Sequence, residues 1–319
     1  MPGRKLLHCF LTCKDIMPNS MERAPKQGRM WKRRRSSRAA MAAVAIAALI
    51  AAGTSAFARN KSNQIQYEYV PPKDPAHQAI YDQMKQGRAL ENLQELLSPL
   101  RLPYPLKLTV AGCDGVPNAW YSNEVVKVCY ELLAEFLKHA SKQDLPMGIS
   151  RADTILGPAL DVFLHETGHA VYDMLQIPIL GRQEDAADQF AAYVMLRLPK
   201  QDARKLILGA AYGYNIQMPQ GVRVSMEVDA FSNEHSLPAQ RAYNVLCIAY
   251  GADRKLFADV VELEFLPKKR AELCPYEYED LTFAMDKLIR PHIDMKRAAK
   301  FHEVWARTVT ARRARLARP

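Results

Sequence analysis

The stretch 161-DVFLHETGHAVYDM-174 decides how the rest of the chain is interpreted. It sets His165, Glu166 and His169 inside an otherwise apolar run. On a helix, residues four positions apart project from the same face, so the two histidines can offer two imidazoles to one ion, with the glutamate beside it. Neutral imidazoles are common ligands of zinc. The stretch therefore predicts a metal-binding helix, and the alternative is an ordinary pair of buried histidines on a core helix.

A third ligand is offered by the stretch that follows, 181-GRQEDAADQF-190. Glu184 and Asp188 are again four residues apart, on one face of the next predicted helix. We expect Glu184 to bind the metal and Asp188 to accept a hydrogen bond from the far nitrogen of a ligand histidine, which fixes its tautomer. Asp185 is the weaker candidate, because Gln189 stands four residues beyond it. Acidic residues are also favoured in a first helical turn, but that explanation leaves their placement after the histidine pair unexplained.

The pattern His-Glu-x-x-His is typical of zinc peptidases, in which the glutamate is the general base. Two histidines and one carboxylate leave a position of tetrahedral zinc open for water. The ion lowers the pKa of that water, and Glu166 is expected to take its proton during attack on a carbonyl. We expect one Zn²⁺ per chain and hydrolysis of peptide or protein substrates. The alternative is a non-catalytic zinc-binding or scaffolding protein that keeps the same geometry.

Two further segments are candidates for contacts with a substrate. The first, 117-PNAWYS-122, is predicted to be an exposed strand edge that binds an extended peptide through its main chain. A partly buried aromatic strand is the other interpretation. The candidate substrate-binding residues are Asn118, Ala119, Trp120 and Tyr121.

The second segment, 231-FSNEHSLPAQR-241, contains a candidate stabiliser of the oxyanion that forms during the attack. His235 is the preferred candidate, Asp229 could orient its imidazole, and Arg241 is the alternative cation. A helix N-terminus at Ser236 is the competing explanation of the segment.

These residues together resemble the thermolysin type of zinc peptidase, which has a glutamate as third ligand and an Asn-Ala-aromatic-aromatic edge strand. A closer resemblance, over about residues 100–285, is to a family of exported bacterial proteins of uncharacterised function that carry a metallopeptidase-like site. The motifs that carry it are a Cys before "NAWY", then "CYEL", "HETGHA", "GRQEDAADQF", "SNEHSLPAQRAYNVLCIAYG" and a late Cys. The resemblance implies a zincin-like fold, in which a small mixed sheet places an edge strand over the active-site helix.

The order of the predicted elements agrees with such an α+β fold. Strands are predicted at 106–110 and on either side of Asn123, with helices over 78–97, 129–140, 158–175 and 182–198 and mainly helical structure afterwards. Pro158 is expected in the first turn of its helix. Gly168 is expected to allow close approach of a neighbouring backbone. The predicted organisation is a leader (1–58), a linker (59–77), a metallopeptidase domain (78–290) and a basic helical tail (291–319).

The formal charge of +10 is concentrated in the leader. Residues 1–58 hold 11 basic and 2 acidic residues, and the remainder is nearly neutral, which argues against a nucleic-acid partner. Residues 30–38 read as the basic part of a signal peptide, 39–52 as its apolar core, and cleavage is expected after Ala58. An uncleaved inner-membrane anchor is the alternative, although 14 apolar residues at about 1.5 Å each fall short of a roughly 30 Å bilayer core. The expected location is the periplasm, with weak membrane contact possible through Arg312, Arg313, Arg315 and Arg318.

Cysteine usage supports export. Four cysteines remain outside the leader, and an even number in an exported chain predicts two disulfides. Three pairings are possible, and free buried thiols are the alternative. We expect the pairing that closes the shortest loops, Cys113–Cys129 and Cys247–Cys274.

Overall fold

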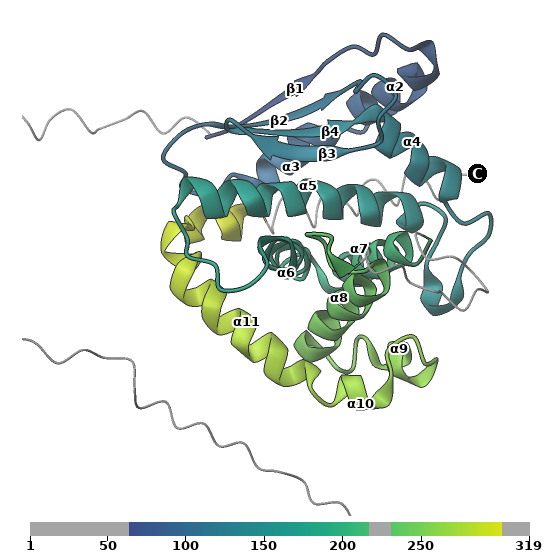
Figure 1. Ribbon diagram of the computed structural model, residues 1–319, viewed down its shortest axis with the longest axis vertical. Helices are drawn as coiled ribbons and strands as arrows, with labels where there is room; N and C mark the ends of the chain where they lie inside the picture. The colour runs from purple at the N-terminus through teal and green to yellow at the C-terminus, as the bar shows by residue number, and fades with distance from the viewer. Residues whose placement is uncertain (1–63, 217–230, 302–319) are drawn as a thin grey trace, which may run out of the picture. The chain divides into compact units, whose positions relative to one another are not determined.

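The computed structural model describes residues 64–216 and 231–301 (Figure 1). The leader with its signal peptide, Asp229 and the C-terminal arginines lie outside the described residues, so those expectations stay predictions. Within the described residues, no helix has both the length and the apolar character needed to cross a membrane.

A four-stranded mixed sheet forms the first layer of the fold. Its spatial order is β1-β2-β4-β3, with β1 and β4 parallel to β2 and with β3 antiparallel to β4. Strand β3 is therefore an edge strand. A two-residue turn joins it to β4, and both turn residues, Asn123 and Glu124, have positive φ, as the common tight hairpins require. The strands are β1 (Ile65–Tyr69), β2 (Leu106–Ala111), β3 (Ala119–Ser122) and β4 (Val125–Cys129).

The helices make up most of the remaining structure. Before the segment that carries His165 and His169, they are η2 (Pro75–His77), α2 (Gln78–Gln86), α3 (Ala89–Leu97), α4 (Tyr130–His139) and η3 (Pro146–Gly148). From that segment onward, they are α5 (Asp153–Met174), α6 (Gln183–Met195), α7 (Lys200–Ile216), α8 (Pro238–Ala252), α9 (Ala258–Glu262), α10 (Lys268–Ala271), α11 (Cys274–Leu288) and η5 (Arg290–His292).

Helix α5 lies between the sheet and the other helices of the second half (Figure 1). It contacts β3 and β4 on one side and packs against α6 and α7 on the other. This position buries most of its length, which explains why its sequence is apolar on nearly every face. The expected α+β class, with a small mixed sheet followed by a mainly helical half, is confirmed.

Helix α5 begins earlier than its sequence suggests. The side chains and backbone of Ser150 and Asp153 exchange hydrogen bonds in the manner of a capping box. Pro158 therefore lies inside the helix, where it is buried, and not in the first turn. Its ring is in close contact with Gly213 of α7, a position where a β-carbon would come within 2.8 Å of Pro158 Cβ.

Three segments differ from the sequence-based organisation. Residues 65–69, expected in a linker, form β1, because Ile65 is fully buried and the segment pairs with β2. The helix expected over 78–97 is divided in two at Arg88, which has φ 52°. Residues 291–301, expected in a tail, pack on the body: Ile293 bridges to Leu100, and Phe301 is buried.

Both expected disulfides are present. Cys113–Cys129 joins the segment after β2 to the end of β4, and Cys247–Cys274 joins α8 to the start of α11. The sequence alone left three pairings open, and the structure has the expected one, which closes the two shortest loops.

Candidate metal centre

Three ligand atoms from two helices converge at one point. The Nε2 atoms of His165 and His169 on α5 are 3.1 Å apart. Glu184 Oε2, from the first turn of α6, lies 3.0 Å from the first of them and 3.4 Å from the second. The three residues form a group able to hold a metal ion.

The spacing of these atoms fits zinc. In a tetrahedral site with metal–ligand distances of about 2.0–2.1 Å, neighbouring ligand atoms are about 3.3 Å apart. The three observed separations of 3.0 to 3.4 Å agree with that value. Two imidazoles and one carboxylate are also the donor set of a zinc site that keeps one position open. The residues present therefore fit the ion.

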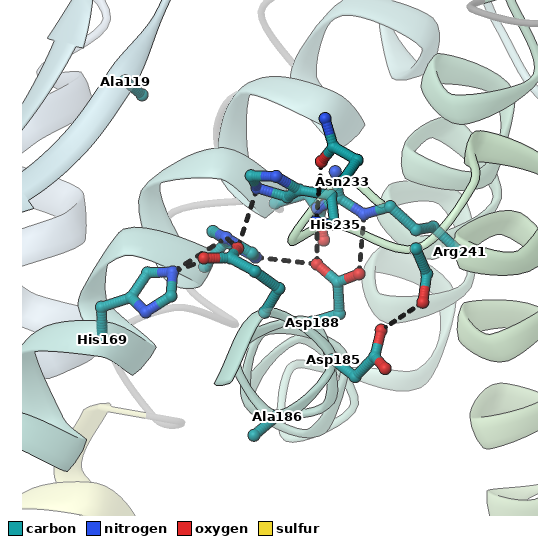
Figure 2. Close-up of polar contacts among 12 residues, drawn as sticks. Ala119, His169, Asp185, Ala186, Asp188, Asn233, His235 and Arg241 are labelled. Carbon is teal, nitrogen blue, oxygen red and sulfur yellow. Dashed lines mark hydrogen bonds and ion pairs between the residues drawn. The ribbon is translucent and has the colours of Figure 1, made fainter. Parts of the chain in front are cut away.

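Outer contacts hold the ligand His165 in place. Its Nδ1 atom lies 2.7 Å from Asp188 Oδ1, so the far nitrogen has the carboxylate partner that the sequence suggested. Asp188 is itself held by Arg241, whose Nε and Nη2 donate to the two carboxylate oxygens at 2.7 and 2.6 Å. Figure 2 shows Arg241 reaching Asp188 from α8. This bidentate contact engages the guanidinium that the sequence offered as an alternative oxyanion stabiliser.

The charges of the ligands are strongly coupled. Burial works to raise the pKa of Glu184, but hydrogen bonds with His165, His169 and His235 outweigh it and hold that pKa well below its usual range. Burial alone would lower the pKa of His165, whereas its bonds to Asp188 and Glu184 raise it to about 9. A metal ion that binds these imidazoles must therefore displace a proton.

Glu166 lies beside the two histidines and is not part of the converging group of candidate ligands. It is buried beside the two histidines and lines the same cavity as they do. Burial raises the pKa of its carboxyl group, and the charges of His165 and His169 act in the opposite direction. A carboxylate with a raised pKa is a better proton acceptor than an exposed one.

His235 also reaches the ligand cluster. Its Nε2 atom is 2.8 Å from Glu184 Oε2, and its backbone N–H donates to Asn233 Oδ1 (Figure 2). The imidazole is two-fifths exposed, so it faces the open side of the site. Ser236 donates to Asp185 and thereby joins the approach to α8 to the first turn of α6. Asp185 is thus engaged away from the ligand cluster.

A cavity of about 630 Å³ runs along the site. Its walls include the edge-strand residues Asn118, Ala119, Trp120 and Tyr121 together with the two histidines, Glu166, Glu184, His235 and Arg241. The Tyr121 hydroxyl donates to Asp173 Oδ2 at 2.8 Å, which ties the edge strand to the last turn of α5. The expected substrate strand and the ligand cluster therefore face one cavity.

Two residues beneath the ligand cluster, neither of them a candidate ligand, were not found from the sequence. Tyr214 on α7 donates to Asp161 at 2.5 Å and lies 3.4 Å from Asp188. Its ring stacks under the Arg241 guanidinium, 4.5 Å from Cζ to the ring centroid. The position of Asp161, four residues before His165 on the ligand face of α5, was the available signal. Nothing in the sequence signalled Tyr214.

Gly168 allows the two ligand helices to approach closely. A β-carbon at this position would lie 3.2 Å from Ala187 Cα and 3.3 Å from Phe190 Cβ, both on α6. The close contact lets the α6 carboxylates reach the α5 imidazoles.

The geometry defines a class of candidate site: two histidines and one glutamate that could hold one metal ion, beside an open cavity. A family model described as "DUF4344: Putative metallopeptidase" matches residues 69–289, and the chain belongs to this family. The match runs from the last residue of β1 to Ile289, the residue that follows α11. The family description indicates a metal-dependent hydrolase acting on peptides or proteins. Neither a protein of curated function nor a solved structure is detectably similar to the chain.

Proposed function

We propose that this protein is a zinc-dependent peptidase of the cell envelope. The observation that carries the proposal is the convergence of His165, His169 and Glu184 beside Glu166, in a cavity bordered by an edge strand. The location is supported by the two disulfides, which form and persist in oxidising compartments.

His165, His169 and Glu184 would hold the zinc, which would supply Lewis acidity and lower the pKa of a water molecule. Glu166 takes the proton of the attacking water and delivers it to the departing amine. Its buried position keeps its carboxylate poorly solvated.

The remaining residues bind and orient the substrate and the ligands. Strand β3 holds an extended peptide by main-chain hydrogen bonds, because its outer edge pairs with no strand among the described residues. His235 donates a hydrogen bond to the oxyanion from the open side of the site. Asp188 fixes the His165 tautomer, and Arg241 keeps Asp188 in position.

Metal analysis and a cleavage assay test the proposal in sequence. The full chain should contain one zinc, and the His165→Ala variant should lose it. A peptide library should then be cleaved in a chelator-sensitive manner, with Glu166→Gln as the control that keeps zinc and loses cleavage. One zinc per chain without cleavage of any peptide would favour a non-catalytic zinc-binding protein over a peptidase. A chain that contains no zinc would reject both hypotheses.

A further inference from the structure

Two buried carboxylates lie near one guanidinium beneath the metal centre. Asp161 and Asp188 are both about 5% exposed. Among the described residues, the ion pair that an arginine or lysine forms with these two aspartates is Arg241–Asp188. Arg241 binds Asp188 with two hydrogen bonds. Burial works to lower the pKa of Arg241, whereas Tyr214 and the negative charges of Asp188 and Asp161 raise it, so the charge of Asp161 also acts on the guanidinium. The two carboxylates therefore compete for one cation.

Asp161 has an unsatisfied oxygen. Its Oδ2 atom accepts the Tyr214 hydroxyl at 2.5 Å, whereas Oδ1 is buried and has no hydrogen-bond partner among the described residues. A buried ionised carboxylate gains greatly from any charged donor that reaches it. Without Tyr214, Asp161 would have no hydrogen-bond donor in the described part of the chain, and Arg241 is the nearby cation that could supply one.

We propose that Tyr214 is a positioning residue: by donating to Asp161, it leaves the Arg241 guanidinium to Asp188, which in turn orients His165 for the metal. The chain of contacts runs through four helices, from α5 (Asp161) to α7 (Tyr214) and from α8 (Arg241) to α6 (Asp188). The Tyr214 ring assists by stacking under the guanidinium. This inference rests on the proposed zinc site, since its consequence is a change in metal binding.

A zinc-binding cycle with three variants of the full chain tests it, with Zn²⁺ as the probe and a chromogenic chelator as competitor. Tyr214→Phe keeps the ring and removes the hydroxyl, so Asp161 should draw Arg241 away, and the Kd for zinc should rise about 10-fold, as for loss of an outer contact. Removing the competing charge as well, in Tyr214→Phe/Asp161→Asn, should return the Kd to within about threefold of the parent chain. Asp161→Asn alone should bind zinc as the parent does.

Tyr212→Phe is the matched control. It removes a hydroxyl from the same helix, one that donates to the His139 carbonyl at 3.1 Å, and it should leave zinc affinity unchanged.

Unchanged affinity in Tyr214→Phe, or affinity that stays low in the double variant, overturns the inference, because rescue by removing Asp161 is not expected of a merely structural tyrosine. Weak binding by Asp161→Asn alone overturns it too, and does so even where Tyr214→Phe fails to fold. A parent chain that binds no zinc marks failure of the proposed function instead.

Discussion

Glu184 is the single residue on which the ligand cluster depends most. Three imidazoles, those of His165, His169 and His235, lie within 3.4 Å of its Oε2 atom. Its carboxylate is the one acidic group among the three candidate ligands, so it would supply the negative charge of that group to a bound ion. Neighbouring Asp185, one residue later, is engaged by Ser236 instead.

Glu184→Gln should therefore weaken zinc binding severely. Loss of an outer partner costs about 10–100-fold in affinity, and loss of a charged ligand should cost more. Zinc titration against a competing chelator measures the change. Asp185→Asn is the matched control on the same helical turn and should bind zinc normally; equal losses in the two variants would contradict the ligand assignment.

His235→Ala should separate metal binding from turnover. The imidazole is expected to stabilise the oxyanion, and removal of one such donor typically costs about 10²–10³ in kcat. Zinc content should be retained, because His235 contacts the ligand Glu184 and is not among the three converging residues. Full peptidase activity in this variant would remove His235 from the mechanism.

The stability of the zinc-free chain should depend on the ionisation of Asp161. Burial, assisted by the charge of Asp188, raises its pKa from 3.8 to about 6. Between these two values the folded state holds the proton more tightly than the unfolded state does, so folding stability is lost as the pH rises through this window. The asparagine of Asp161→Asn cannot ionise. Between pH 4 and pH 7, the free energy of unfolding of this variant should therefore rise relative to that of the parent chain by on the order of 3 kcal/mol. Urea unfolding at the two pH values measures this, and a stability difference that does not vary with pH would contradict it.

At the scale of the elements, helix α5 is held between neighbours that approach it unusually closely. Its contact with α7 has no room for side chains: a β-carbon at Gly209 would lie 2.0 Å from the Asp153 carbonyl oxygen, and one at Gly157 would lie 2.5 Å from the Ala210 nitrogen. The contact with α6 at Gly168 is looser by comparison. The glycines therefore set the distance between helices that carry the site.

Gly209→Ala should destabilise the protein. The added methyl group must push α5 and α7 apart, and overpacking of this kind costs about 1–3 kcal/mol, more than alanine returns through its higher helix propensity. The midpoint of thermal unfolding measures it. Gly112→Ala is the control, because a β-carbon there meets nothing nearer than Glu131 Oε1 at 4.0 Å; a Gly209→Ala variant as stable as this control would show that the helices can separate freely.

At the scale of the whole molecule, one of the two disulfides lies next to the candidate site and the other lies away from it. Cys113–Cys129 closes a 16-residue separation and adjoins β3, the candidate substrate strand, because the Cys129 backbone N–H donates to the Asn118 carbonyl. Cys247–Cys274 closes a 27-residue separation between α8 and α11 and touches no residue of the ligand cluster. Both were expected from the even number of cysteines, together with the shortness of the loops.

Replacement of either pair by serine should cost about 3 kcal/mol of stability, as loop-closure entropy predicts for these lengths. Only the Cys113→Ser/Cys129→Ser variant should also raise KM for peptides, since it loosens β3, and both variants should keep zinc. Denaturant unfolding and steady-state kinetics test the two parts separately. A KM effect of equal size in both variants would argue that β3 is not the substrate strand.

The local spacing of residues was sufficient to predict much of the fold and of the candidate site. The i, i+4 placement of His165 and His169, and of Glu184 and Asp188, follows from helical geometry alone, and the structure brings the first three of these residues to one point. The sheet was predicted except for β1, whose short polar sequence becomes a strand only because Ile65 is buried and β2 offers hydrogen bonds. The predicted start of α5 was wrong because Pro158 was expected in the first turn. In the structure, Pro158 lies inside the helix, where it packs against Gly213.

What the sequence by itself determined, then, are the features set by local spacing: the candidate ligand residues with the nearby carboxylate Asp188, and the edge-strand motif. The tertiary structure alone decided the partners that come from distant helices. The sequence offered Arg241 as an alternative oxyanion stabiliser, whereas in the fold its guanidinium binds Asp188. Tyr214 reaches Asp161 only because α7 packs closely on α5. The physical reason is that hydrogen bonds between buried charges depend on the positions of whole helices, which the packing of glycines and apolar side chains sets.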